Sequence, residues 1–322
     1  MRAFLSWVAL VGLAGTGRAQ QPSLDDLEVK KIASGMAFTE GPVWFPKERF
    51  LVFSDIPRSK LMKWSLESGL ELYRDCEQSN GNLLDLEGRL LTCQHGARNL
   101  IRSVKGGEVT VLADRYDGKR LNSPNDVAVQ SDGTLWFTDP PWGLANQREG
   151  RELEGHWVYR LDPESRDLRV VIRDLAMPNG IALSPDEKRL YVADTGGHPS
   201  HPDPGLHRKP ATLSAYEIGA DNELSKEPAW RVQTLCDGMC VDEHGNVYAT
   251  GRGVTVWKPD GTAIGAIKVP EQPANVCFGG VDYKTLFITA RTSLYCVDLD
   301  VAGSIPPGAR WRTAARNKLP DR

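Results

Sequence analysis

Six side chains with a carboxylate or amide oxygen recur at a regular position along the chain, and they are the residues best placed to do chemistry. Each lies 9 or 10 residues before the start of a short strand rich in β-branched and aromatic residues. The six are Glu40, Asn80, Asn125, Asn179, Asp237 and Asn275. Brought together, such oxygens would suit a hard divalent cation, Ca²⁺ or Mg²⁺ first, with Mn²⁺ or Zn²⁺ as substitutes. Glu40 and Asp237 would neutralise its two charges.

Turns are the alternative explanation for these residues. Asn-Gly or Asp-Gly occurs at positions 80, 179 and 237, and both dipeptides are common in turns. For a single copy the turn is the simpler interpretation. Each repeat, however, has turn residues of its own further along, and a turn does not require the glutamate at position 40. Taken as a set, the six residues favour metal coordination.

Repeated pairs of strands must position these oxygens. The second strands of the pairs begin at residues 50, 89, 134, 189, 246 and 285, at intervals of 39 to 57 residues. This is the period of a four-stranded propeller blade with variable loops. The predicted fold is therefore all-β, a six-bladed β-propeller with four-stranded blades around a central channel. We expect the segment 27–33 to be a strand that completes the last blade and closes the ring.

Residues that follow the second strands should line the mouth of the channel. Among them, His95, Trp142 and His198 are candidates to hold a substrate, and His95 to move protons. That loop histidines are merely solvated stays an equal alternative. Aspartates at the same place more often cap loops than catalyse; these are Asp55, Asp139 and Asp194.

The two ends of the chain differ from the repeats. Residues 1–19 have a basic start, a short apolar stretch and small residues before Gln20, which is typical of a secretory signal peptide cleaved after Ala19. We therefore expect an exported protein, periplasmic or secreted, with no membrane span after cleavage. The propeller is expected over 20–303, and a C-terminal surface tail over 304–322.

Charge and cysteine content narrow the partners. The 322 residues carry a formal charge of −3, so the basic field that nucleic-acid binding requires is missing. The six cysteines do not form the CxxC pairs of a zinc ribbon. In an exported protein they could pair as disulfides, or they could be buried thiols. The sequence leaves these two alternatives open.

Seven segments together resemble the SMP-30/gluconolactonase/LRE-like family, and they cover nearly the whole chain after the signal segment. They are TEGPVWFP at 39–46, LVFSDIP at 51–57, KRLNSPNDVAV at 119–129, LWFTDPPWG at 135–143, PNGIALSPDEKRLYVAD at 178–194, CDGMCVDEHGNVY at 236–248 and FGGVDYKTLFITA at 278–290. The resemblance implies a six-bladed propeller whose axial divalent metal supports hydrolysis of sugar lactones or, in relatives, of other esters and phosphotriesters.

The same resemblance implies roles for individual residues. Glu40, Asn179 and Asp237 match the family's metal ligands, and Asn125 matches a residue that touches the metal or the substrate beside it. Some members carry an arginine two positions before this asparagine that helps to hold the sugar. Ser123 stands there in this chain, which leaves the particular lactone open.

Lactone hydrolysis sets what these residues must do. Water attacks the ester carbonyl, and the oxyanion that develops needs fixed positive charge. We expect a central divalent cation, Ca²⁺ first, to polarise the carbonyl, Asp237 to act as ligand and as base or water-positioner, and Asn125 to orient the carbonyl. A nucleophilic serine is disfavoured because the chain has no GxSxG motif.

Two other functions stay open at this stage. One is an esterase or phosphotriesterase that uses the same cation, with Asp237 as the attacking nucleophile. The other is a non-catalytic propeller that binds a protein or a carbohydrate and keeps its cation for rigidity. A fold alone does not decide among them, because propellers have many unrelated functions.

Overall fold

The computed structural model describes residues 23–104, 107–197 and 203–307, and nearly all the regular structure in these ranges is β-strand. The helices in the described ranges are single 3₁₀ turns of three residues. They are η1 Leu24–Asp26, η2 Ile56–Arg58, η3 Ala145–Gln147, η4 Pro204–Leu206 and η5 Ala220–Asn222. None of them has the length and hydrophobicity needed to cross a lipid bilayer.

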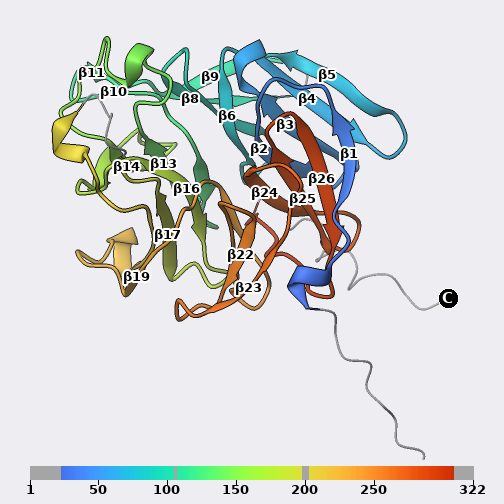
Figure 1. Ribbon diagram of the computed structural model, residues 1–322. Helices are drawn as coiled ribbons and strands as arrows, with labels where there is room; N and C mark the ends of the chain where they lie inside the picture. Colours follow the sequence, from blue (N-terminus) through green and yellow to red (C-terminus); the bar gives the residue numbers. More distant parts are fainter. Residues whose placement is uncertain (1–22, 105–106, 198–202, 308–322) are drawn as a thin grey trace, which may run out of the picture.

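Six antiparallel sheets of four strands each form the blades, so the predicted six-bladed propeller is confirmed (Figure 1). In blades 1 to 3 the strands are, from the inside outward, β2 Thr39–Phe45, β3 Phe50–Asp55, β4 Lys60–Ser65 and β5 Gly69–Asp75; β6 Ser79–Leu84, β7 Leu90–Gln94, β8 Asn99–Ser103 and β9 Val109–Ala113; β12 Val127–Val129, β13 Leu135–Asp139, β14 Trp157–Leu161 and β15 Leu168–Ile172.

Blades 4 to 6 repeat this order, and a small extra hairpin lies outside the blades. The strands are β16 Pro178–Leu183, β17 Arg189–Asp194, β18 Thr212–Glu217 and β19 Trp230–Gln233; β20 Met239–Val241, β21 Val247–Thr250, β22 Val254–Trp257 and β23 Ala263–Ile267; β24 Pro273–Gly279, β25 Thr285–Ala290, β26 Ser293–Asp298 and β1 Lys30–Ser34. The hairpin pairs β10 Arg115–Tyr116 with β11 Lys119–Arg120.

The N-terminal strand closes the ring. Strand β1 pairs antiparallel with β26 as the outer strand of blade 6, which Figure 1 shows as blue beside red. This confirms the closing strand expected from the sequence, although it begins at Lys30. The Glu271 carboxylate reinforces the closure, because it accepts hydrogen bonds from Lys31 Nζ at 3.0 Å, Ser293 Oγ at 2.6 Å and Tyr295 Oη at 2.9 Å. The inner strands of neighbouring blades contact one another all the way round, including β24 with β2.

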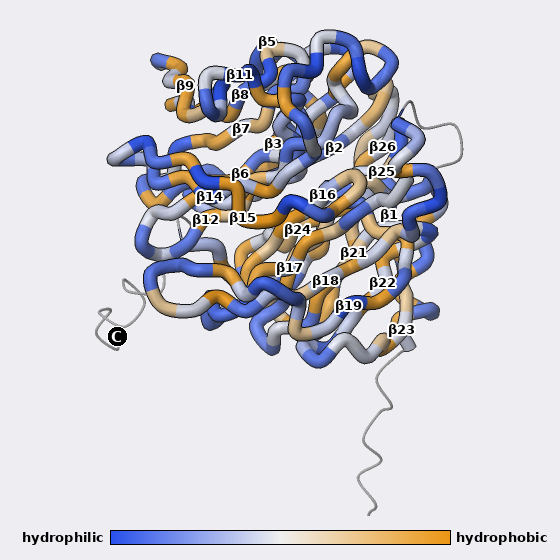
Figure 2. The backbone as a smooth tube through the Cα atoms, turned by 90° about the vertical axis from the view of Figure 1, so that its left-hand side faces the viewer, coloured by the Kyte–Doolittle hydropathy of each residue, from blue (hydrophilic) through white to orange (hydrophobic). Residues whose placement is uncertain are grey.

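Hydrophobic side chains fill the spaces between neighbouring blades. Blades 3 and 4, for example, enclose Trp136, Val158, Leu190 and Tyr216, all buried. Figure 2 shows the same division along the chain, with hydrophobic residues concentrated in the strands and hydrophilic ones in the connecting loops. Packing of this kind fixes the angle between blades and so the width of the channel.

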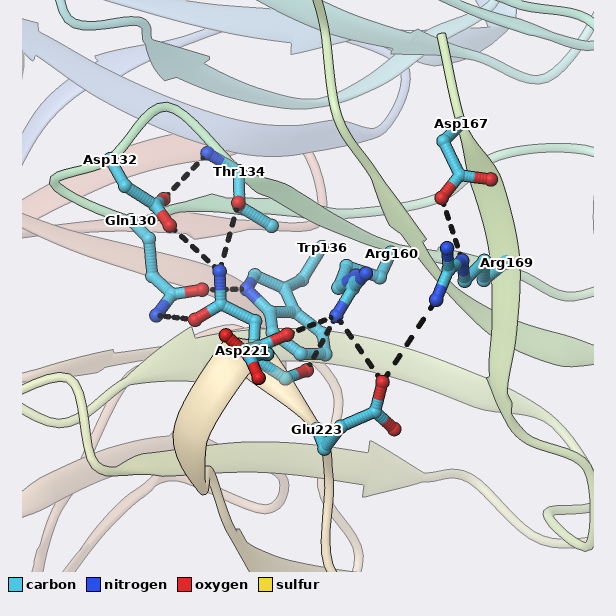
Figure 3. A network of polar contacts seen from close by, with 10 residues as sticks. Gln130, Asp132, Thr134, Trp136, Arg160, Asp167, Arg169, Asp221 and Glu223 are labelled. Atoms are coloured by element: carbon cyan, nitrogen blue, oxygen red, sulfur yellow. Dashed lines mark hydrogen bonds and ion pairs between the residues drawn. The ribbon is translucent and has the colours of Figure 1, made fainter. Parts of the chain in front are cut away.

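A polar network joins blades 3 and 4, from the end of the inner strand β12 outward (Figure 3). Arg160 of β14 donates to the carbonyl oxygen of Asp221 at 2.8 Å and lies 3.9 Å from Glu223. Beside it, the Trp136 indole N–H donates to Gln130 at 2.7 Å. The loop between β18 and β19 is thereby tied to its neighbouring blade.

The six cysteines are free thiols in this structure. Cys76, Cys93 and Cys236 are buried, and burial raises the pKa of the Cys93 thiol well above its usual range. Of the two alternatives left open by the sequence, the structure therefore supports buried thiols for these three.

Residues 304–307, at the start of the expected C-terminal tail, lie at one end of the channel. The Ser304 N–H donates to the carbonyl oxygen of Val241 at 2.8 Å, and Ile305 packs against hydrophobic residues of blades 5, 6 and 1. These residues and the inner strands enclose a mainly apolar cavity of about 140 Å³. The rest of the tail and the expected signal peptide lie outside the described residues.

Glycines next to the predicted site let the inner strands come into backbone contact. A Cβ at Gly180 would lie 2.3 Å from the carbonyl oxygen of Asp237, so no side chain fits there. The Gly180 N–H instead donates to that oxygen at 3.0 Å. A Cβ would also meet backbone atoms at Gly41 and Gly81, whereas at Gly238 it would lie 2.0 Å from the side-chain Cγ of Asn275. Each of these glycines directly follows one of the six predicted oxygen residues.

We expect Gly180→Ala to destabilise the protein by about 1–3 kcal/mol, the usual effect of overpacking. The added methyl group would meet backbone atoms of blade 5 that cannot move aside. Gly219→Ala is the matched control, since its Cβ would meet nothing closer than an oxygen at 3.5 Å. Urea unfolding of both variants checks this. Equal stabilities would show that the inner strands tolerate a wider spacing.

Candidate metal centre and active site

The oxygen ring, meaning Glu40, Asn80, Asn125, Asn179, Asp237 and Asn275, lies at the start of the six inner strands. Four of its members are inside those strands, and Asn125 and Asp237 each precede one by two residues. Five are at most 6% exposed, and Asp237 is more open. The turn alternative is wrong for Asn80 and Asn179. Each asparagine lies within a strand, and the glycine directly after it does not have the positive φ that an Asn-Gly hairpin turn requires.

Carboxylates of the ring interact across the channel. Burial raises the pKa of Glu40 to about 7, although its Oε2 accepts the Gly41 N–H at 2.8 Å. Burial and the negative charges of Glu40 and Asp126 raise the pKa of Asp237 well above its usual range. The structure therefore brings blades 1 and 5 close enough for their carboxylates to repel each other.

Asp126 is a third carboxylate at this place that the sequence analysis missed. Burial and the charge of Glu40 raise its pKa to about 7. In four of the repeats, the residue directly after the ring residue (Glu40, Asn80, Asn179 or Asp237) is glycine. After Asn125 that position is occupied by Asp126. That departure from the repeat was the signal in the sequence that could have revealed it.

Amide groups satisfy part of this negative charge. Asn275 hydrogen-bonds through its side chain to both Glu40 and Asp126, while its Oδ1 accepts the Val276 N–H at 2.8 Å. The Asn179 side chain hydrogen-bonds to Asp237 and lowers its pKa. Asn179 and Asp237, two of the predicted ligands, are therefore in direct contact.

His95 lies beside the ring, at the loop that follows β7. Its Nε2 is 3.0 Å from Asn80 Nδ2 and 3.5 Å from Asn125 Nδ2. Burial lowers the pKa of His95 to about 4, so the imidazole is neutral near pH 7 and accepts a hydrogen bond. The histidine is thus a buried partner of two ring amides, and the solvated-loop alternative is wrong for it.

Ser123 and Trp142 belong to one loop structure over His95. The Ser123 hydroxyl donates to the carbonyl oxygen of Pro140 at 2.6 Å and accepts the Gly143 N–H at 2.9 Å. A Cβ at Gly143 would lie 2.5 Å from that of His95, so this loop rests directly on the histidine. Trp142 Nε1 is buried and has no partner among the described residues. His198 lies outside the described residues.

The three aspartates that end second strands hold loops together. Asp139 accepts the N–H groups of Asn122 at 2.8 Å and Ser123 at 2.7 Å. Asp55 and Asp194 bind the residues before β2 and β16 in the same way. The structural role considered for them from the sequence is confirmed.

The donors of the ring fit a hard divalent cation. Two carboxylates and several amide oxygens are the ligand types that Ca²⁺ and Mg²⁺ take. Asn80 Oδ1 is buried without a hydrogen-bond partner in the described part of the chain, as expected of an oxygen that serves an ion. Among the described residues, no three His, Cys, Asp or Glu side chains are arranged to hold a metal. A cation here would therefore depend on amide oxygens as well as on Glu40 and Asp237.

Known proteins resemble this chain along most of its length. The gluconolactonase of Zymomonas mobilis is 31% identical over 291 residues, covering 81% of this chain and 78% of the relative. The pentonolactonase XacC of Haloferax volcanii is 28% identical, covering 78% and 80%. The solved structure of a gluconolactonase from Xanthomonas campestris is 33% identical with a TM-score of 0.75, covering 86% of this chain and 91% of the other.

Residues 38–292 match the model of the SMP-30/gluconolactonase/LRE-like region. That span includes all six members of the oxygen ring and every blade strand except the two outer strands of blade 6, β26 and β1. The chain therefore belongs to the SMP-30/gluconolactonase/LRE-like family, as its sequence motifs indicate.

Proposed function

We propose that the protein is a hydrolase that opens sugar lactones of the gluconolactone type, with a divalent cation, Ca²⁺ first, in the oxygen ring. The observation that carries the proposal is the convergence of Glu40, Asn179 and Asp237 at the start of the inner strands. Relatives named for gluconolactone and pentonolactone hydrolysis support the substrate class.

Glu40, Asn179 and Asp237 would hold the cation, with Asn125 beside them. When bound, the cation supplies the positive charge that polarises the lactone carbonyl and stabilises the developing oxyanion. Asn125 orients the carbonyl from blade 3, where its Nδ2 faces His95. The sugar ring would lie against the loop of Ser123 and Trp142, which rests on His95.

Asp237 acts as the base for the attacking water. Its carboxylate would accept a proton from a neighbouring water molecule, while the Asn179 amide holds the carboxylate in position. The water oxygen forms a bond to the carbonyl carbon, and one water proton passes to Asp237. The bond between that carbon and the ring oxygen then breaks, and the ring oxygen takes the proton from Asp237 to become a hydroxyl, which returns Asp237 to its charged form. The product is an open-chain hydroxy acid.

Export of the mature chain is part of the same proposal. The pattern of residues 1–19 supports a cleaved signal peptide, and a periplasmic or secreted enzyme would meet sugar lactones outside the cytoplasm.

Replacing Asp237 by Asn or Glu40 by Gln should reduce lactone hydrolysis by more than about 100-fold, the range lost with a catalytic base or its equivalent. Both changes keep the side-chain shape and remove one negative charge from the ring. Initial rates on a panel of sugar lactones measure the loss, before and after chelation and readdition of single metals. Asp260→Asn, in an exposed turn, is the control and should keep its rate. Full activity after chelation would contradict the proposed metal dependence.

A single turnover in ¹⁸O-labelled water should place the label in the hydroxy acid and leave Asp237 unlabelled. Direct attack by water gives this result, because the new oxygen bonds only to the substrate carbon. Mass spectrometry of the product and of the peptide containing Asp237 measures both. Label in the aspartate would instead identify it as the attacking nucleophile.

Acidification from pH 8 to 6.5 should stabilise the metal-free protein by roughly 1 kcal/mol. The pKa values of Glu40 and Asp126 are about 7 in the fold, above those of unfolded carboxyl groups, so the folded chain binds more protons in this window. That stability is lost as pH rises through 7. Urea unfolding in chelator measures it, and Glu40→Gln should show a smaller gain. A stability that instead increases with pH would mean that these carboxylates stay charged in the fold.

A further inference from the structure

Asn80, the blade 2 member of the oxygen ring, has an amide oxygen with no donor in the described part of the chain. The residue is 3% exposed, and Oδ1 is among the buried polar atoms without a partner. Leaving such an oxygen unsatisfied costs about 1–3 kcal/mol. Native structures rarely keep one unless water, an ion or a ligand serves it. The oxygen therefore indicates something that the protein alone does not supply.

His95 determines which way this amide faces. Its Nε2 lies 3.0 Å from Asn80 Nδ2, and the Nδ2 of Asn125 approaches the same nitrogen at 3.5 Å. A neutral ring nitrogen that faces two N–H groups accepts from them. Both asparagines thus turn their NH₂ groups toward the histidine and their oxygens away from it.

The backbone of Asn80 is fixed against the strand that carries Glu40. A Cβ at Gly41 would lie 2.1 Å from the Asn80 carbonyl oxygen. That carbonyl also accepts from Ser54 Oγ at 2.7 Å and Asn82 Nδ2 at 2.8 Å. Asn80 is therefore held next to one predicted ligand, Glu40, and beside another, Asn125, on the following blade.

Asn275 shows that position in the ring is not enough to make an oxygen available. Its Oδ1 accepts the Val276 N–H at 2.8 Å, and its amide hydrogens face Glu40 and Asp126. Asn275 therefore holds the two carboxylates in place, and its oxygen already accepts a backbone hydrogen bond. Of the two ring members outside the ligand set implied by the family, only Asn80 keeps a buried oxygen without a partner among the described residues.

We propose that Asn80 Oδ1 is an additional oxygen donor to the divalent cation of the ring, and that His95 is the positioning residue that turns this oxygen toward it. The inference rests on the proposed metal dependence and adds two residues of blade 2 to it. His95 acts through the asparagine amides and does not itself touch the cation.

Calorimetric titration of the full chain with Ca²⁺, after removal of bound metal by a chelator, tests this. Asn80→Ala should weaken Ca²⁺ binding by about 10- to 100-fold, the range seen when residues around a metal are lost. His95→Phe keeps a flat ring but cannot accept a hydrogen bond, and it should weaken binding by about 10-fold. Asn80→Asp should tighten binding, because it places a charged oxygen where the amide oxygen was. Asn246→Ala, at a hairpin turn, is the control and should bind as the unchanged protein does.

Several results would overturn the assignment. Unchanged affinity in Asn80→Ala would do so, as would an Asn80→Asp variant that binds as weakly as Asn80→Ala, because Asn80 would then serve only as a donor to His95. Thermal unfolding in chelator shows whether each variant is folded. If Asn80→Ala does not fold, the Ca²⁺ affinity of His95→Phe decides the test instead. If the unchanged protein binds no Ca²⁺, Mg²⁺, Mn²⁺ or Zn²⁺, the proposed metal dependence falls with it. Metal-dependent hydrolysis with unchanged affinity in Asn80→Ala and His95→Phe would remove only this inference.

Discussion

The loss of water around three carboxylates at the start of the inner strands is the constraint that the rest of the structure has to accommodate. Glu40, Asp126 and Asp237 come from three different blades, and each has a raised pKa because burial removes its water. A fold gains nothing in stability from such a cluster, since each charge is costly to bury and its neighbours add to the cost. Amide donors from Asn179 and Asn275 relieve part of this cost, and protons or a bound cation would relieve more of it. The protein thus gives up stability to keep a site where positive charge is strongly favoured.

The propeller holds this cluster together because its six blades form a closed ring. The inner strands contact one another around a closed ring, and hydrophobic side chains fill the spaces between blades. Glycines after four of the ring residues let neighbouring backbones touch, and the aspartates Asp55, Asp139 and Asp194 tie the entrance of an inner strand to the strand beside it. No single element could hold three carboxylates together. The closed ring can, because moving one blade outward would require moving its neighbours.

The sequence predicted the architecture well and the site only in part, for reasons that individual residues make clear. Repeat spacing is a property of the chain itself, so it gave six blades, the closing strand and the in-register oxygens. Asp126 was missed because it breaks the repeat, and only the fold shows that its carboxylate faces Glu40. Ser123 was considered as a sugar contact, but its hydroxyl is occupied by the loop at 140–143, a pairing between distant positions. The Asn275 oxygen accepts the N–H of the next residue, Val276, whereas the Asn80 oxygen has no partner in the described part of the chain; repeat spacing is the same for both and so does not reveal this difference.

The two ends of the channel differ in polarity: the oxygen ring lies at one end, and an apolar cavity lies at the other. Below the ring, the cavity is lined mainly by aliphatic residues such as Val127, Ile181 and Val276, and residues 304–307 lie at its far end. Apolar walls lower the local dielectric constant, so each charge in the ring acts more strongly on its neighbours and on any ion beside them. Asp126 and Asn275 stand at the boundary, because both line this cavity and both contact or influence Glu40. A polar substrate would find few hydrogen-bond partners in this apolar half, so we expect it to approach from the opposite side, where His95 contacts the oxygen ring.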